Sequence, residues 1–350
     1  MKVVVAMSGG VDSSVVAGLL VEQGYDVQGV SLRLWEGEKV GPRNCSDHHG
    51  AQEIAALLGI NHTLLDLREQ FVETVVRPFA QDYLHGRTPN PCVACNRDFK
   101  LGKLLGWAKE QGADYVATGH YARIVREEGG GRISLFRGAD SGKDQSYFLF
   151  ALSHYQMAQT LFPLGAMQKS DVRSQARRLG LPVADRSESQ DICFGDYQAL
   201  VKSYASQDEI VGGEVVDRSG KVLGQHAGIH GVTIGQRRGL GISASRPLYV
   251  VDIEAESKQV VVGTKKDLGC KGLIAGDINW IESSDEDEIA AEVQVRYRSR
   301  AIPCVVRRMV EGTSEVRFTE DCPAVTPGQA AVFYRGDRLL GGGWITRAIR

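Results

Sequence analysis

The sequence predicts an α/β protein with a β-rich second half: an N-terminal doubly wound parallel sheet, a small β-rich middle domain and a C-terminal β-barrel. The first supporting observation is KVVVAM at residues 2–7, because a continuous β-branched run is typical of a parallel strand buried on both faces. The second is the alternation of such runs with helical segments. The third is a change near residue 205, after which short strands follow one another.

The first half alternates predicted strands and helices. Strands are expected at residues 2–7, 25–34, 62–67 and 113–120, and helices at 15–24, 51–58 and 101–111. A glycine ends or follows each of these helices, as is common at helix C-termini. Ligands bind beyond the carboxyl ends of the strands in such sheets, and SGGVDSS, SLRLW and TGHY fall there. We therefore expect the active site at this edge.

The second half contains short β segments, beginning with the predicted hairpin GGEVVDRSGKVLG. The predicted domains are 1–204, 205–272 and 273–350. Near the start of the last domain, AEVQVRYRSR predicts an alternating strand with Val293, Val295 and Tyr297 on one side and Arg296, Arg298 and Arg300 on the other. Such an arginine row suits a phosphate backbone, although a solvated polar face has the same pattern.

Composition excludes several classes of protein. The 350 residues carry a net charge of −2, so the whole chain shows no basic signal for nucleic acid. The longest apolar runs fall short of a membrane span, which predicts a cytoplasmic protein with no membrane partner. Seven cysteines are an odd number, which argues against a secreted disulfide framework. Clustered thiols are then expected to be catalytic, redox-active or metal-binding.

The segment SGGVDSS predicts a nucleotide-binding loop between the first strand and its helix. Glycines allow a tight turn that brings backbone amides close to phosphate oxygens, and serine hydroxyls add donors. Phosphate would repel Asp12 unless this carboxylate holds Mg²⁺ or fixes the loop. The segment matches the pyrophosphatase-type loop that splits ATP between its α- and β-phosphates, and it is not a Walker A sequence. The alternative is a glycine-rich turn that caps a helix.

Two thiols lie three positions apart in TPNPCVACN, at Cys92 and Cys95. The flanking prolines predict a rigid exposed loop, with a helix beginning at Asn96. Cys95 would then lie at a helix N-terminus, where the dipole lowers a thiol pKa. A zinc site requires four ligands, and Cys45 with its neighbouring histidines is a poor second pair. Nucleophile, disulfide switch and cluster ligand remain open.

Six motifs occur in order: SGGVDSS, GRTPNPCVACN, ATGHYAR, KDQSYFL, SESQDICF and GQRRGLGI. Together they make the chain similar to the bacterial tRNA-specific 2-thiouridylases (MnmA type) of the pyrophosphatase-loop ATPase superfamily, over nearly its whole length. The resemblance implies an adenine nucleotide α-hydrolase-like first domain and a β-barrel that contacts tRNA. It also implies a cytoplasmic sulfurtransferase that uses ATP and Mg²⁺ to form 2-thiouridine at the wobble position of the tRNAs for lysine, glutamate and glutamine.

The resemblance also assigns roles to particular residues. Cys193 matches the persulfide cysteine, Cys95 its partner in a turnover disulfide, and Asp12 a catalytic carboxylate. The expected ATP-binding residues are Ala6, Met7, Ser8, Gly9, Gly10, Val11, Asp12, Ser13, Leu32 and Gly119. The expected contacts with the target base and tRNA are Asn90, Pro91, Cys92, His120, Lys143, Asp144, Gln145, Arg296, Tyr297 and Gln329. The sulfur donor is expected to be a cysteine desulfurase relay or inorganic sulfide.

One residue departs from the family pattern, in which many members carry Asp where Cys92 stands. This third thiol leads to a second hypothesis, a [4Fe–4S] cluster held by Cys92, Cys95 and Cys193. Two other functions remain open. An ATP-dependent amidating or ligase enzyme with the same loop would not need the thiols, and a redox-sensing RNA-binding protein would not need the loop chemistry.

Overall fold

The computed structural model describes residues 1–36, 47–127, 131–187, 193, 195–206, 208–282, 286–310 and 312–350. They divide into two compact units: unit 1 contains 1–75, 92–195 and 337–340, and unit 2 contains 76–91, 196–336 and 341–350. Each unit is described by itself. Within the described ranges, every helix is too short or too polar to cross a membrane.

Unit 1 contains a five-stranded parallel sheet in the order β3-β2-β1-β4-β7. Its strands are β1 (Lys2–Ala6), β2 (Asp26–Arg33), β3 (Asn61–Asp66), β4 (Tyr115–Ala117) and β7 (Thr160–Leu161). The central strand β1 is buried on both faces, which explains its continuous run of valines. Strand order reverses beside β1, so the loops after β1 and β4 flank the switch point where such sheets bind ligands.

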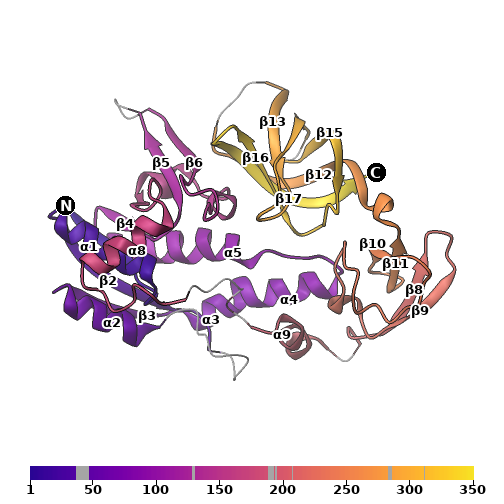
Figure 1. The fold of residues 1–350 in the computed structure, drawn as a ribbon, viewed down its shortest axis with the longest axis horizontal. Coiled ribbons are helices and arrows are strands. Elements are labelled where there is room, and N and C mark those ends of the chain that lie inside the picture. The colour runs from indigo at the N-terminus through magenta and orange to yellow at the C-terminus, as the bar shows by residue number, and fades with distance from the viewer. Residues whose placement is uncertain are drawn as a thin grey trace. The chain divides into compact units, whose positions relative to one another are not determined.

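Helices cover the sheet of unit 1 (Figure 1). They are α1 (Val11–Glu22), α2 (His48–Leu57), α3 (Arg68–Phe71), α5 (Pro91–Ala94), α6 (Leu104–Glu110), α7 (His154–Ala158) and α8 (Lys169–Arg178), with the π-helical segments η1 (Val72–Val76) and η2 (Cys95–Lys103) and the 3-10 turn η3 (Ser146–Phe148). Side chains of α1, α2 and α8 form one apolar cluster with β1 and β2.

A separate hairpin also belongs to unit 1. Its strands are β5 (Ala122–Arg126) and β6 (Ile133–Arg137), which pair antiparallel. The first residues of β17 (Arg338–Ile349) continue this ladder, with Arg338 opposite Phe136. The hairpin follows β4 directly, so it begins beside the edge where we expect the active site.

Unit 2 begins with α4 (Arg77–Leu84) and continues from α9 (Tyr197–Tyr204) into a four-stranded sheet in the order β10-β11-β8-β9. These strands are β8 (Gly213–Asp217), β9 (Val222–His226), β10 (Tyr249–Glu254) and β11 (Gln259–Gly263), accompanied by the short turns η4 (Ile229–Gly231) and η5 (Lys265–Leu268). Valines of β8, β10 and β11 form the core of this small β-rich domain.

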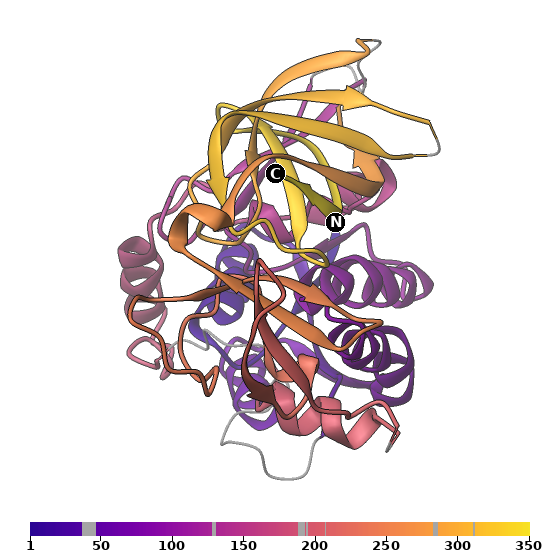
Figure 2. The ribbon, with the colours of Figure 1, turned by 90° about the vertical axis from the view of Figure 1, so that its right-hand side faces the viewer.

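The remainder of unit 2 is an antiparallel barrel of six strands, closed because β17 pairs with β12 (Figure 2). The other strands are β13 (Glu288–Gln294), β14 (Ile302–Arg308), β15 (Ser314–Pro323) and β16 (Ala330–Arg335), with β12 at Gly269–Trp280. Closure leaves the barrel no unpaired edge. The predicted fold class is therefore confirmed in its three parts: parallel sheet, small β domain and β-barrel.

Candidate active site

The loop after β1 is held in shape by its own serines. The backbone amide of Ser8 donates to Ser13 Oγ at 3.1 Å, and Ser14 Oγ donates to the carbonyl of Gly10 at 2.8 Å. Gly9 adopts a φ of +73°, and a Cβ there would lie 2.6 Å from the carbonyl oxygen of Asp47. Glycine is therefore required at this position. The result is a preformed tight loop at the N-terminus of α1, as anion binding requires.

Asp12 is the centre of a charged cluster beside this loop. Lys169 Nζ lies 2.7 and 2.8 Å from its two carboxylate oxygens, and the Tyr121 hydroxyl donates to Oδ1 at 2.7 Å. Lys169 is only 8% exposed, and its ammonium also lies 5.6 Å from the Tyr121 ring centroid. Sequence reasoning missed both partners. Lys169 is 157 positions from Asp12 and opens an ordinary-looking helix, so the sequence contains no local signal for the pair.

Arg186 braces the loop from another side. Its Nη1 donates to the carbonyl of Gly9 at 3.0 Å and to Asp47 Oδ2 at 2.7 Å. Asp47 in turn accepts from the Gly50 amide at the start of α2, and its own amide donates to the carbonyl of Ser8. The Gly50 hydrogen bond and the Arg186 guanidinium lower the pKa of Asp47. A charged bridge thus connects the loop to α2.

The other expected ATP-binding residues lie at the same edge of the sheet. Leu32 lies near the end of β2, and Gly119 follows β4. A Cβ on Gly119 would lie 3.0 Å from Asp12 Cβ and 3.2 Å from the amide nitrogen of Ser13. The two loops can therefore approach this closely because residue 119 has no side chain. The structure therefore brings together the loop residues 6–13 and Gly119, as the sequence predicted.

The sequence predicted an exposed loop for the two neighbouring thiols, but in the structure both lie in a helix. The helix begins at Pro91, not at Asn96, so Cys92 is in its first turn and Cys95 begins the π-helical segment. Proline favours the first helical position because its fixed φ suits the helix and its missing N–H has no helical partner there. Cys95 is therefore beyond the first turn, where the helix dipole has little effect.

Burial sets the ionisation of both thiols. Cys95 is 7% exposed, and burial raises its pKa. Burial also raises the pKa of Cys92 to about 11, against the weaker opposite effect of the Lys100 ammonium. The predicted lowering of the Cys95 pKa was wrong, because desolvation of the thiolate outweighs the nearby positive charge. Both groups are protonated thiols at neutral pH in this structure.

Cys193 differs from these two thiols. It is exposed and disulfide-bonded, whereas Cys92 and Cys95 form no disulfide. The structure therefore contains no Cys95–Cys193 disulfide. Among the described residues, no group of three or more His, Cys, Asp or Glu side chains is arranged to hold a metal ion. This arrangement does not fit an iron–sulfur cluster on Cys92, Cys95 and Cys193, or a zinc site; Cys45 lies outside the described residues.

The expected tRNA contacts of unit 1 lie close to the charged cluster. Gln145 Oε1 accepts from the Tyr121 amide at 3.0 Å, and the Gln145 amide donates to the carbonyl of Tyr121 at 2.9 Å. Asp144 accepts from the Gly138 amide and pairs with Arg137 at 2.9 Å. Lys143 is half-buried and precedes them. Tyr121 thereby connects this segment to Asp12.

His120 is a buried side chain at the end of the β4 loop. Its Nδ1 lies 2.7 Å from Thr118 Oγ1, and its ring contacts Phe162 edge-on. Burial lowers the pKa of His120 to about 3, so the imidazole is neutral at physiological pH. In this structure His120 is therefore a satisfied, buried histidine, and a direct contact with tRNA would require it to become exposed.

Unit 2 contains the remaining expected contacts. Asn90 is buried and Pro91 begins α5. Gln329 Nε2 donates to the carbonyl of Thr88 at 2.8 Å, so it holds the segment that leads to Asn90. The predicted strand of alternating arginines is wrong in its second half, because β13 ends at Gln294.

A turn follows β13. Its Arg298 has a φ of +67°, which a regular strand does not allow, and lies over the Tyr297 ring. Arg296 is fixed within unit 2: its Nη2 donates to the carbonyl of Ile234 at 3.0 Å and to Thr326 Oγ1 at 2.8 Å. Arg300 pairs with Glu320. These three arginines do not form a row.

A parallel sheet with a glycine–serine loop and, at its switch point, a carboxylate paired with a buried ammonium defines a nucleotide-binding domain of the HUP class. Family models agree: "tRNA methyl transferase HUP domain" matches residues 1–196, "tRNA methyl transferase PRC-barrel domain" 198–264 and "Aminomethyltransferase beta-barrel domain" 270–345. The chain belongs to the family of the tRNA-specific 2-thiouridylases.

Two curated relatives illustrate this membership. The tRNA-specific 2-thiouridylase MnmA of Geobacter metallireducens is 48% identical over 99% of this chain and 97% of its own length. That of Syntrophotalea carbinolica is 49% identical over 98% of each chain. Among solved structures, the U34-tRNA thiolase NcsA from Methanococcus maripaludis with its [4Fe-4S] cluster covers 58% of this chain and 64% of its own, at 19% identity and a TM-score of 0.35.

Proposed function

We propose that this protein is a tRNA sulfurtransferase that uses ATP to replace O2 of a uridine with sulfur. The observation that carries the proposal is the preformed loop with Asp12 and Lys169, in a chain that is 48% identical over 99% of its length to a tRNA-specific 2-thiouridylase. The predicted domains 1–204, 205–272 and 273–350 would then supply catalysis, a connecting β domain and tRNA contact.

The loop is suited to the triphosphate of ATP. Backbone amides at the start of α1 face the expected phosphate position, and Lys169 supplies a nearby positive charge. Asp12 is the carboxylate that fits Mg²⁺, which would neutralise the charge that develops on the pyrophosphate. We infer that nucleotide binding redistributes the Asp12–Lys169 pair, so that the carboxylate turns to the metal ion and the ammonium to a phosphate oxygen.

The reaction has three balanced steps. O2 of the uracil attacks the α-phosphorus, the bond to the bridging oxygen of the β-phosphate breaks, and pyrophosphate leaves. The terminal sulfur of a Cys193 persulfide attacks C2, and the C2–O bond breaks with AMP as the leaving group. Cys95 then attacks the Cys193 sulfur, which releases 2-thiouridine and leaves a Cys95–Cys193 disulfide; two electrons from a dithiol reductant restore both thiols.

The thiol geometry places conditions on these steps. The existing disulfide of Cys193 must be reduced before Cys193 can carry a persulfide. Cys95 must lose its proton and become accessible, because it is now buried with a raised pKa. The target base must be flipped out of its stack to reach both reagents. A cysteine desulfurase relay would supply the persulfide sulfur, whereas inorganic sulfide would bypass the persulfide: hydrosulfide would attack C2 directly and AMP would leave, with no disulfide formed. The expected substrates are the tRNAs for lysine, glutamate and glutamine at their wobble uridine.

Mass spectrometry of tRNA nucleosides tests the proposal. The reduced protein is incubated with ATP, Mg²⁺, tRNA and sodium sulfide, or with a cysteine desulfurase and cysteine as the donor. The expected product is a wobble uridine with one sulfur in place of one oxygen. A methylated uridine, or AMP formed with an aminated small molecule and unmodified tRNA, would overturn it. Tight tRNA binding with no AMP formed under either donor would favour a non-catalytic RNA-binding protein.

A further inference from the structure

A loop in the small β domain of unit 2 carries positive charge that the protein itself does not neutralise. We define the arginine loop as residues 235–248, between η4 and β10. Arg237, Arg238 and Arg246 on this loop are exposed. Residues 227–251 contain no Asp or Glu. Within the part of the chain that the structure describes, none of the three side chains forms a hydrogen bond or an ion pair.

Several other exposed arginines of unit 2 are paired, although the isolated Arg307, Arg335 and Arg347 are not paired with any residue that the structure describes. Arg218 pairs with Asp267 at 2.5 Å, Arg317 with Glu315 at 3.0 Å and Arg350 with Asp252 at 3.1 Å. Pairing occupies a guanidinium fork that would otherwise bind an anion. The arginine loop is therefore a local concentration of available forks, and the net charge of −2 for the whole chain conceals it.

The loop is fixed at its base and its middle. The Gly235 amide donates to the carbonyl of Val250 at 2.8 Å, and the Val250 amide donates to the carbonyl of Gln236 at 2.9 Å. Leu240 is buried and belongs to the core of the small domain, with Ile242 packed against it. Two anchors thus hold the backbone while the arginines stay in solvent, so binding an anion would order only the side chains.

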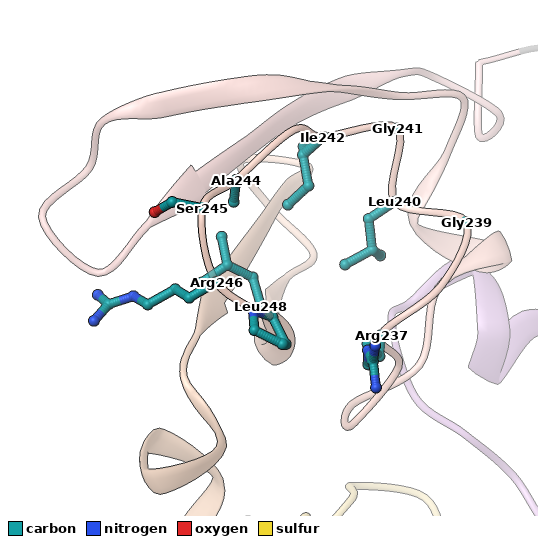
Figure 3. A pocket seen from close by; sticks show the side chains of 10 residues that line it. Arg237, Gly239, Leu240, Gly241, Ile242, Ala244, Ser245, Arg246 and Leu248 are labelled. Atoms are coloured by element: carbon teal, nitrogen blue, oxygen red, sulfur yellow. The ribbon is translucent and has the colours of Figure 1, made fainter.

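The loop encloses a hollow of about 400 Å³ (Figure 3). In this view Leu240 and Ile242 point into it, while Arg237 and Arg246 lie on opposite sides, with the Arg246 side chain extending outward. Glycines at 239 and 241 have φ of +76° and +66°, and their exposed backbone allows close approach of a ligand. An apolar floor between two cationic groups is complementary to one nucleotide, with the base on the floor and phosphates at the rim.

The loop also adjoins an expected tRNA contact. Arg296 Nη2 donates to the carbonyl of Ile234, the residue directly before the loop, and lies 3.7 Å from the position that a Cβ on Gly235 would occupy. Arg296 is thus fixed beside the loop within unit 2. We propose that the arginine loop binds the sugar–phosphate backbone of the tRNA, with one nucleotide in the hollow, and that it forms one continuous RNA surface with Arg296 and Tyr297. This inference rests on the proposed function.

The test compares tRNA binding by the full-length protein and two variants over a range of salt concentrations. In R237Q/R246Q we expect tRNA affinity at low salt to fall about tenfold, and the slope of log Kd against log salt to decrease by about 1.4, or about 0.7 for each lost phosphate contact. The matched control R218Q removes an exposed but paired arginine of the same unit. In this variant we expect the tRNA affinity and the slope of log Kd against log salt to stay unchanged. Sulfur incorporation at saturating tRNA should persist in R218Q.

Three results would overturn the inference: an unchanged slope in R237Q/R246Q, an equal change in R218Q, or displacement of the tRNA from the loop by millimolar inorganic phosphate or AMP, which would indicate a small-anion site. Far-ultraviolet circular dichroism verifies that the variants are folded. If the wild-type protein binds tRNA through this loop but incorporates no sulfur, the proposed function fails and the loop assignment stands. If the wild-type protein incorporates sulfur but the slope is unchanged in R237Q/R246Q, the proposed function stands and the loop assignment fails.

Discussion

The nucleotide loop (residues 8–14) and the helical segment that contains Cys92 and Cys95, here called the cysteine helix, both belong to unit 1. Only the nucleotide loop already has the geometry that its proposed role requires. The loop already has the geometry that phosphate binding needs, with a carboxylate and a buried ammonium 2.7 Å apart. The cysteine helix holds its thiols buried and protonated, and Cys193 is occupied in a disulfide. The difference indicates that the nucleotide loop needs no rearrangement to bind ATP, whereas the proposed sulfur transfer would require reduction and a rearrangement. The two half-reactions should therefore be separable by mutation.

The largest effect is expected at the nucleotide loop, in D12N. This change removes the carboxylate that fits Mg²⁺ and leaves the buried Lys169 ammonium without its counterion. Both AMP formation and tRNA thiolation should fall at least about a hundredfold, measured by chromatography of nucleotides and nucleosides. K169M should reduce both equally. The matched control is D140N, because Asp140 accepts from the backbone amide of Lys169 and not from its ammonium; a loss in D140N equal to that in D12N would contradict the account.

The second effect should separate the two regions. With a cysteine desulfurase as the donor, thiolation should become undetectable in C95S and C193S, while tRNA-dependent release of pyrophosphate continues for at least one turnover, since neither thiol lies at the nucleotide loop. C304A, which removes a buried thiol of β14 in unit 2, serves as the control and should keep both activities. Thiolation by C95S at more than a tenth of the wild-type rate would remove Cys95 from the mechanism.

The third effect concerns pH and the buried His120. Its folded-state pKa of about 3 is below the unfolded value, so its contribution to stability is complete above about pH 6.5 and is lost as pH falls toward 3. Between pH 7.5 and pH 5 this should cost about 2 kcal/mol of the free energy of unfolding. In H120Q that part of the pH dependence should disappear, while H154Q, at an exposed histidine, should retain it. Denaturant unfolding at several pH values measures the difference; identical pH profiles would contradict a neutral buried His120.

A smaller effect is expected at Gln329. Loss of its hydrogen bond to the carbonyl of Thr88 in Q329L should lower the free energy of unfolding by about 1 kcal/mol. If Gln329 also contacts tRNA, the affinity for tRNA falls further than this loss of stability accounts for. Unchanged stability with weaker tRNA binding would show that the hydrogen bond to Thr88 contributes nothing.

The smallest effect is expected at Cys92. The described residues do not fit a cluster, so C92A should thiolate tRNA within about threefold of the wild-type rate, since it removes one partly buried thiol. Iron and acid-labile sulfide assays on protein purified without oxygen provide the second readout. Loss of activity together with loss of bound iron in C92A would revive the cluster hypothesis.

Local sequence predicted the parts of this molecule that local forces determine. The valines of β1 indicated a buried parallel strand, and the glycines and serines at 8–14 indicated the loop, because each pattern has few structural solutions. The pair of Lys169 with Asp12 was not predictable, since the fold brings together residues 157 positions apart. Tyr121 is comparable: its motif was noted, but its bond to Asp12 depends on where the β4 loop meets α1.

The cysteine segment shows a different limit. Two prolines favoured an extended loop, although Pro91 also fits the first position of a helix, and the structure realises the second possibility. The thiol pKa depended on burial by distant side chains, which the helix position alone does not reveal. The prediction that Arg296 lies in an arginine row on a strand was wrong for a similar reason. The alternating pattern continues past Gln294 in the sequence, but the strand ends there and the Arg296 guanidinium donates a hydrogen bond to the carbonyl of Ile234.

The most direct test of the central claim follows the oxygen that leaves the uridine. A tRNA carrying a heavy-oxygen label at O2 of the target uridine is incubated with the reduced protein, ATP, Mg²⁺ and a sulfur donor, and the AMP is analysed by mass spectrometry. Adenylation at O2 predicts that the label appears in the phosphate of AMP, with one labelled AMP for each 2-thiouridine formed. Label found in water, with unlabelled AMP, would contradict the account.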